Sequence, residues 1–174
     1  MSRPGAARPD PGGAARCSSF TLARALGAAI AAGADVINLS LAGPPDPLLA
    51  RLTEYAIGRG IVVVGALPPA GARSGFPGDV AGVLAVRSSD DGAPPGSGLA
   101  APGRDILTLA PGGRYDYATG SSLAAAQISG AVALLRALSP GLDAAQARED
   151  LGARGAVASV CQAVRRLRAQ ARCD

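Results

Sequence analysis

The stretch IVVVGAL, residues 61–67, decides the fold class of this 174-residue chain. Its first four residues are apolar and β-branched with no polar residue between them, a pattern typical of a strand covered on both faces. Gly58 and Gly60 stand just before the run, and Pro68 and Pro69 follow it. Because Gly and Pro interrupt regular structure, the run predicts one short strand inside a parallel sheet.

Upstream of this strand the sequence alternates between helical and strand patterns. Leu22, Leu26 and Ile30 recur at every fourth position after the capping candidates Ser18 and Ser19, which predicts an amphipathic helix. The apolar run DVINLSL, residues 35–41, predicts the next strand. A second helix is then expected from a capping residue and a first-turn proline, with an apolar stripe on one face: Asp46, Pro47, Leu48, Leu49, Leu52, Tyr55 and Ala56.

Downstream, VLAV at residues 83–86 predicts a third strand, and DILTLAPGGRYDYATG at residues 105–120 predicts a hairpin around its Pro-Gly-Gly turn. A long helix is expected at about residues 122–138, and Asp143 with Gln146 form a capping-box pattern for another. A last helix is expected at about residues 156–171. Together these patterns predict an α/β fold of three layers, a mainly parallel sheet with helices on both faces.

Composition narrows the function classes. Residues 1–16 are rich in Pro, Gly, Ala and Arg and predict a flexible lead-in, followed by one domain over residues 17–174. The net charge is +4, and all 17 basic residues are arginines. The densest basic run, VRRLRAQAR at residues 164–172, has helical spacing and no aromatics, so we read it as a solvated helix face and expect no nucleic-acid partner.

The sequence also bears on the membrane, the compartment and the cysteines. No run approaches the length of a transmembrane helix, so no membrane partner is expected. Residues 1–16 have no apolar core and do not form a signal peptide. The compartment therefore stays open, and an exported or periplasmic location is compatible with the sequence. Cys17, Cys161 and Cys173 fit no zinc motif; Cys161 and Cys173 could pair in an exported protein, and idle thiols are the alternative in a cytosol.

The segment GSS at residues 120–122 presents two hydroxyls at the start of the long helix. Such residues most often cap a helix. They can also present a nucleophile, because the unpaired N–H groups and the dipole of a helix N-terminus favour a developing negative charge. A serine nucleophile is usually activated by His or Lys, and the sequence contains neither.

Four segments in order resemble the subtilisin-like serine peptidases, the subtilases: DVINLSLAGP, GIVVVGALPPAG, VLAV with LAAPG, and GSSLAAAQISGAVALL. The resemblance covers about residues 20–152 and corresponds to the C-terminal half of a subtilase catalytic domain, so the N-terminal part of the fold is expected to be missing. It implies a serine-type endopeptidase acting on a peptide or protein substrate. No cofactor is expected; calcium is common in the family, but Asp46, Asp90 and Asp91 give no complete ligand set, and turn or cap roles suit them better.

Carried over by position, the resemblance makes Ser122 the nucleophile. Ser40, Leu41 and Ala42 would line the cleft as substrate-binding residues, with Ala42 in place of a glycine. Pro69 stands where the family has its oxyanion-hole asparagine, and Pro68 where it has the preceding glycine. In subtilisin, loss of that asparagine lowers turnover by about a hundred- to a thousandfold. Loss of the histidine lowers it by about a millionfold.

Three hypotheses follow. The first is a subtilase domain truncated at its N-terminus, whose open sheet edge requires a covering segment. The second is a non-catalytic pseudopeptidase that binds extended peptides along residues 37–41 by strand addition. The third is complementation by a separate chain that carries Asp and His. Under all three, the isolated chain is expected to be inactive, since the nearby Asp116 is expected to face solvent from the hairpin.

Overall fold

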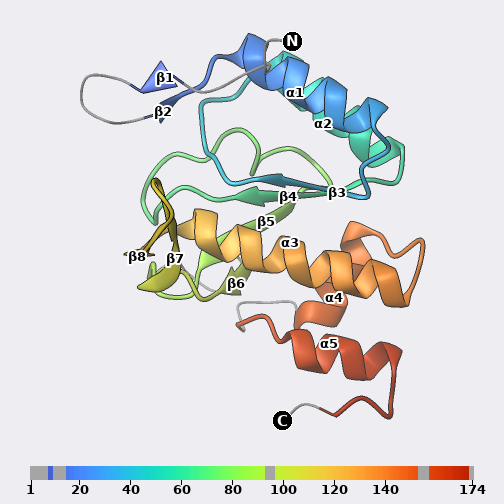
Figure 1. Ribbon diagram of the computed structural model, residues 1–174. Coiled ribbons are helices and arrows are strands. Elements are labelled where there is room, and N and C mark those ends of the chain that lie inside the picture. The colour runs from blue at the N-terminus through green and yellow to red at the C-terminus, as the bar shows by residue number, and fades with distance from the viewer. Residues whose placement is uncertain (1–7, 10–14, 93–96, 153–156, 173–174) are drawn as a thin grey trace.

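The computed structural model describes residues 8–9, 15–92, 97–152 and 157–172 (Figure 1). The helices are α1 (Ser19–Ala31), α2 (Pro47–Gly58), α3 (Ser121–Leu138), α4 (Ala144–Gly152) and α5 (Val160–Leu167). The strands are β1 (Arg8–Pro9), β2 (Ala15–Arg16), β3 (Val36–Leu39), β4 (Val62–Ala66), β5 (Leu84–Ser88), β6 (Leu99–Ala101), β7 (Ile106–Ala110) and β8 (Arg114–Ala118). The predicted alternation of helix and strand from α1 to β4 is confirmed.

A four-stranded parallel sheet lies at the centre, in the order β3, β4, β5, β6. The predicted strands at residues 35–41, 61–67 and 83–86 are its first three members. The fourth, β6, was not predicted, because it has three residues and none of them is β-branched. Within the described residues, β3 pairs with β4 on one side and has no strand on its other side. The edge of the sheet at β3 is therefore open.

Helices cover both faces of this sheet, as predicted. α1 and α2 lie over one face, and α3 lies against the other, with α4 and α5 beyond it (Figure 1). Alternate residues of β4 supply two separate cores. Val62 and Val64 pack in the cluster that holds the buried face of α3, whereas Val63 packs in the cluster that holds Leu26 of α1 and Leu49 of α2. This two-sided burial explains why the strand has no polar residue.

The predicted helix caps are present. The Ser18 hydroxyl accepts a hydrogen bond from the Thr21 amide at 3.2 Å, and the Asp46 carboxylate accepts from the amides of Leu48 and Leu49 at 3.0 and 3.1 Å. Hydrogen bonds from the Ser19 side chain and then from the Leu49 and Leu48 amides hold the pKa of Asp46 below its usual value.

The capping box before α4 is also confirmed. The Asp143 amide donates to the Gln146 side chain at 3.0 Å, and the Gln146 amide donates to the Asp143 carboxylate at 2.8 Å.

The expected apolar stripe of α2 was partly wrong. Leu49 and Ala56 are buried, but Leu48 and Tyr55 are 53% and 55% exposed. α2 packs against α1 and β4, and its buried stripe includes Thr53, whose hydroxyl donates to the Leu49 carbonyl at 2.8 Å. A polar residue can occupy this buried position because the preceding helical turn supplies its acceptor.

α3 is long and apolar enough, by length and composition, to cross a membrane, which corrects the expectation that no segment approaches that length. Its place in the fold gives a different reason for its apolar character. Ala124, Ile128 and Leu135 are buried in the core that α3 shares with the sheet. A core helix between a sheet and further helices needs apolar residues on more than one face.

The chain ends differ from the sequence expectations in detail. In the lead-in, β1 and β2 pair in antiparallel fashion, which composition did not predict. α5 covers Val160–Leu167, shorter than the expected helix at 156–171.

The cysteines differ from one another. Cys161 is disulfide-bonded, whereas Cys17 is a free, exposed thiol. The reading of all three cysteines as idle thiols was therefore wrong for Cys161. The pairing that the sequence leaves open for an exported protein joins Cys161 to Cys173, which lies outside the described residues.

Candidate active site

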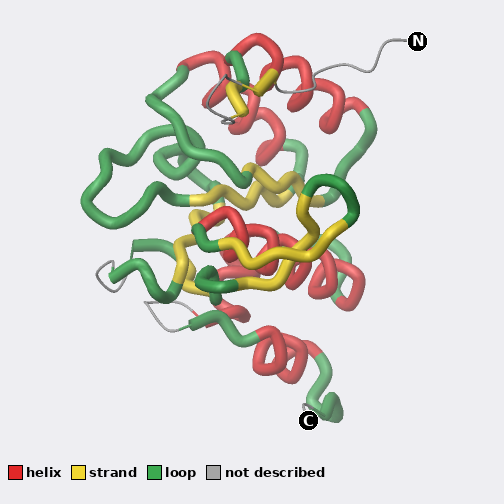
Figure 2. The backbone as a smooth tube through the Cα atoms, turned by 60° about the vertical axis from the view of Figure 1, so that its left-hand side comes forward, coloured by secondary structure: helices red, strands yellow, loops and turns green. Residues whose placement is uncertain are grey.

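The hairpin of β7 and β8 directly precedes the start of α3 in the chain. Figure 2, in which this end of the molecule comes forward, shows the hairpin in front of the helix. The Gly120 amide, between β8 and α3, donates to the Gly103 carbonyl at 2.7 Å. A Cβ at Gly103 would lie 2.6 Å from the Ser88 hydroxyl and 2.9 Å from the Gly120 carbonyl oxygen. Only glycine at position 103 therefore allows this close approach of the helix start to the end of β5.

Ser122 lies in the first turn of α3 and is partly buried. Its hydroxyl donates to the Ser40 carbonyl at 3.2 Å, and the Ser40 hydroxyl donates in return to the Ser122 carbonyl at 2.9 Å. Asn38, in β3, donates its side-chain amide to the Ser40 hydroxyl at 3.0 Å. The structure thus brings together two of the residues that the resemblance selected, the nucleophile candidate and the first residue of the substrate-binding segment.

Neither serine of the GSS segment caps α3. The N-cap is Gly120, which has no side chain and makes no side-chain cap bond. The Ser121 hydroxyl accepts from the Ser88 amide at 3.3 Å and so ties the helix start to β5. Because capping does not account for either hydroxyl, the two serines have separate roles: Ser121 contacts the sheet and Ser122 faces the end of β3.

α3 is fixed relative to β3 at both ends. At its start Ser122 contacts Ser40, just after β3, and near its end the Arg136 guanidinium donates to the Asp35 carbonyl at 3.1 Å, just before β3. The same Arg136 nitrogen donates to the Gly60 carbonyl at 2.6 Å, ahead of β4. Further along the first turns, the Gln127 amide donates to the Pro102 carbonyl at 2.8 Å. Residue 127 therefore serves as a structural link between α3 and the segment after β6.

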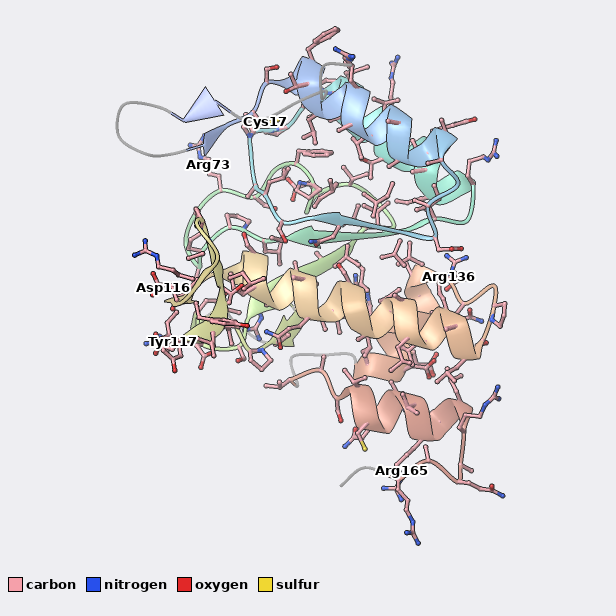
Figure 3. The ribbon with its side chains drawn as sticks, in the orientation of Figure 1. Cys17, Arg73, Asp116, Tyr117, Arg136 and Arg165 are labelled. Carbon is pink, nitrogen blue, oxygen red and sulfur yellow. The ribbon has the colours of Figure 1, made fainter. Side chains whose placement is uncertain are left out.

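No base contacts Ser122 among the described residues, where the hydrogen bonds of its side chain run to Ser40 alone. Asp116, the nearest carboxylate in sequence on the hairpin, is exposed and projects outward (Figure 3). Its carboxylate accepts from the Tyr117 amide at 2.8 Å. The expectation that Asp116 faces solvent is confirmed. The Ser122 hydroxyl donates a hydrogen bond to the Ser40 carbonyl, and no base among the described residues is placed to take its proton.

Pro68 and Pro69 follow β4 by two and three residues and begin the loop after this strand. Just after β4, the Leu67 amide donates to the Val86 carbonyl at 2.7 Å. Neither proline has an N–H group to donate. The Pro69 carbonyl accepts from the Ala72 amide at 3.0 Å and closes a turn. At the position where the resemblance expects an oxyanion donor, this loop therefore offers none.

A cavity of about 480 Å³ separates the end of the β3 segment from this loop. Its lining residues are Ala42, Gly43, Pro44, Pro45, Pro68, Arg73 and Ser74. The Gly43 amide donates to the Phe76 carbonyl at 2.9 Å, and the backbone at Gly75 passes so close that a Cβ there would lie only 2.2 Å from the Gly43 carbonyl oxygen.

The three expected substrate-binding residues therefore lie in different surroundings. Ser40 contacts Ser122, Ala42 lines the cavity, and Leu41 packs with the core beneath α1 and α2. Sequence reasoning missed Arg73, because nothing local to a loop arginine indicates that it will face the end of a distant strand.

A metal site is not evident in the part of the chain that the structure describes, where no group of three or more His, Cys, Asp or Glu could hold an ion. Asp46 caps α2, and Asp91 pairs with the buried Arg87 at 3.3 Å.

Comparisons with known proteins agree with this architecture. The sequence model of the subtilase family matches residues 6–156. Subtilisin BL of Lederbergia lenta is 33% identical over 129 residues, which are 68% of this chain and 48% of that protein. The chain thus spans about half the length of this curated relative.

Two solved structures are similar as well. The patellamide maturation protease PatA has a TM-score of 0.71 and 26% identity, over 88% of this chain and 70% of that one. The PatG macrocyclase in complex with peptide has a TM-score of 0.73 and 25% identity, over 91% and 59%. The predicted α/β fold with helices on both faces of a parallel sheet is confirmed by this likeness.

Proposed function

Because this chain belongs to the subtilase family, we propose that it supplies the nucleophile and the peptide-binding strand of a serine peptidase site, without being able to hydrolyse peptides alone. The observation that carries the proposal is the paired contact between Ser40 and Ser122. It holds a serine hydroxyl in the first turn of a helix, beside the end of an edge strand. A helix N-terminus favours negative charge there, which suits the transition state of acyl transfer.

The chain lacks the groups that would activate Ser122. The 174 residues contain no histidine and no lysine. A serine without its base retains only the small part of catalysis that binding and charge stabilisation supply. Pro69 removes a further contribution, since a proline donates no hydrogen bond to an oxyanion. Turnover by this chain alone is therefore expected to be indistinguishable from that of a variant without the hydroxyl.

The open edge of β3 supports a role for a second segment or chain. Ile37 and Leu39 are buried on the face of the sheet that α1 and α2 cover, yet the outer backbone edge of β3 has no strand beside it in the described residues. Such an edge attracts another strand. We propose that a strand docks here, and that in an active assembly the base comes from residues supplied with it.

A non-catalytic peptide-binding module is the second candidate, and Pro68 and Pro69 favour it. An extended peptide would add to β3 along Ile37–Leu41 through main-chain hydrogen bonds. The similar structure of the PatG macrocyclase in complex with peptide is compatible with such a surface in this fold. The two candidates share the binding strand and differ in whether Ser122 is ever activated.

Two measurements on the purified chain test the proposal. First, release of product from a fluorogenic peptide is compared for the wild type and Ser122→Ala, with a subtilisin as positive control. The two curves are expected to coincide. Second, hydrogen–deuterium exchange of the amides at 37–41 is compared with and without an extended peptide, and slower exchange is expected with peptide. Hydrolysis that depends on Ser122 in the chain alone would overturn the claim of inactivity, and unchanged exchange would overturn the claim of strand addition.

A further inference from the structure

The cavity lined by Ala42, Pro68 and Arg73 carries a charge that the proposed function does not use. Arg73 is the one charged residue among the described residues that line it. Its neighbours on the wall are three prolines together with Ala42, Gly43 and Ser74. Figure 3 shows Arg73 at the same end of the molecule as the β7–β8 hairpin that leads to Ser122. The cavity is therefore an apolar recess with one cation beside the candidate active site.

The Arg73 guanidinium is available to a ligand. Among the described residues, no hydrogen bond or ion pair holds it, and the residue is exposed. Two other polar groups of the wall are already engaged. The Gly43 amide donates to the Phe76 carbonyl, and the Ser74 hydroxyl donates to the Asp79 carboxylate. The prolines have no N–H to offer. A ligand in this recess would thus find its charged partner in Arg73.

The recess lies within reach of a peptide bound at β3. Ala42 is two residues beyond Ser40, whose carbonyl accepts from the Ser122 hydroxyl. Two residues of extended chain span at most about 7 Å. A peptide that runs along this segment alternates its side chains between opposite faces, so that one of them faces the loop that carries Arg73. The cavity, at about 480 Å³, has room for a single side chain.

We propose that Arg73 makes this recess a site for an acidic side chain, Asp or Glu, of the extended peptide bound beside Ser122. The inference rests on the proposed function, because it requires a peptide at β3. A guanidinium presents a planar fork of donors that matches a carboxylate. The carboxylates of Asp46, Glu54 and Asp79 line the adjoining cavity and not this one.

The test compares three labelled peptides that differ only at the central residue, which is Glu, Gln or Lys, by fluorescence anisotropy with the full chain. The wild type is expected to bind the Glu peptide about three- to fivefold more tightly than the Gln peptide, and the Lys peptide most weakly. Arg73→Gln should abolish the difference between Glu and Gln, and Arg73→Glu should reverse the order of Glu and Lys. High salt should reduce the preference, because it screens exposed charges.

The matched control is Arg165→Gln, which changes the net charge equally at the far end of the molecule (Figure 3). This variant should keep the preference for Glu. Equal binding of all three peptides by the wild type, or a Glu preference that survives in Arg73→Gln, would overturn the inference and leave peptide binding at β3 standing. Failure of every peptide to bind would instead overturn the proposed peptide-binding function together with the inference that rests on it.

Discussion

Ser40 and Ser122, 82 positions apart in the chain, each donate a side-chain hydrogen bond to the other's carbonyl, at 2.9 and 3.2 Å. This exchange joins the end of an edge strand to the first turn of the longest described helix. It also defines the state of the candidate nucleophile. A hydroxyl that donates to a carbonyl keeps its proton, whereas an activated serine gives its proton to a base. The contact therefore fits a correctly placed but unactivated serine.

Removing one half of this exchange should weaken the fold measurably. Ser40→Ala removes the hydroxyl that bonds the Ser122 carbonyl. We expect a loss of about 0.5–1.5 kcal/mol in the free energy of unfolding, measured by urea denaturation. Ser129→Ala is the control on the same helix, since its hydroxyl bonds only to the Ala125 carbonyl one turn back. An equal loss in both variants would show that the Ser40 contact has no special part in joining β3 to α3.

Gly103 should tolerate no side chain. Gly103→Ala places a Cβ 2.8 Å from the Ser88 Cβ and 2.9 Å from a backbone oxygen, so the start of α3 must shift, at about 1–3 kcal/mol. Gly130→Ala is the matched control, because a Cβ there meets no other atom within 4 Å and alanine favours a helix interior by about 1 kcal/mol. Thermal unfolding of the two variants should therefore shift in opposite directions. A stabilised Gly103→Ala variant would contradict the close approach described at the site.

Asp46 should make stability depend on pH. Its pKa in the folded chain is lowered from the usual 3.8, so the stabilisation is complete above that value and is lost as the pH falls through the lowered folded-state pKa. Asp46→Asn keeps a capping side chain without the charge. Between pH 6 and about pH 3, the melting temperature of the wild type should fall further than that of Asp46→Asn. Parallel curves for the two proteins would show that the Asp46 charge does not contribute.

The cysteines should differ in reactivity. Cys17 is exposed and free, whereas Cys161 is disulfide-bonded. In the oxidised, folded protein iodoacetamide should modify the peptide that contains Cys17 and leave the peptide that contains Cys161 unmodified, as read by mass spectrometry. After reduction and unfolding, both should be modified. Alkylation of Cys161 before reduction would contradict the disulfide.

Much of the fold could be predicted because local signals and burial agree. Val62, Val63 and Val64 lie between two helical layers, and a strand in that position must be apolar throughout. The caps at Ser18 and Asp46 depend only on the next few residues, so their pattern identifies them. β6 was missed because pairing with β5, and not local preference, makes Leu99–Ala101 a strand.

The candidate site was less accessible to sequence reasoning. Ser122 and Ser40 were selected by resemblance, and their mutual contact depends on how α3 crosses β3, which no local pattern encodes. Arg73 shares its cavity with Ala42 only because the loop after β4 folds back and the Gly43 amide bonds the Phe76 carbonyl. The roles assigned to Ser122, Pro69, Ser40, Leu41 and Ala42 stay predictions until a bound peptide is observed.

The central claim is that the chain binds an extended peptide beside Ser122 and does not cleave it alone. The most direct test is a time course of fluorescence anisotropy for one end-labelled acidic peptide, recorded with the wild type and with Ser122→Ala. We predict that the signal rises on mixing and then stays constant in both proteins, because the bound peptide remains whole. A rise followed by decay in the wild type alone would contradict the claim by revealing a self-sufficient peptidase, and the absence of any rise would contradict peptide binding.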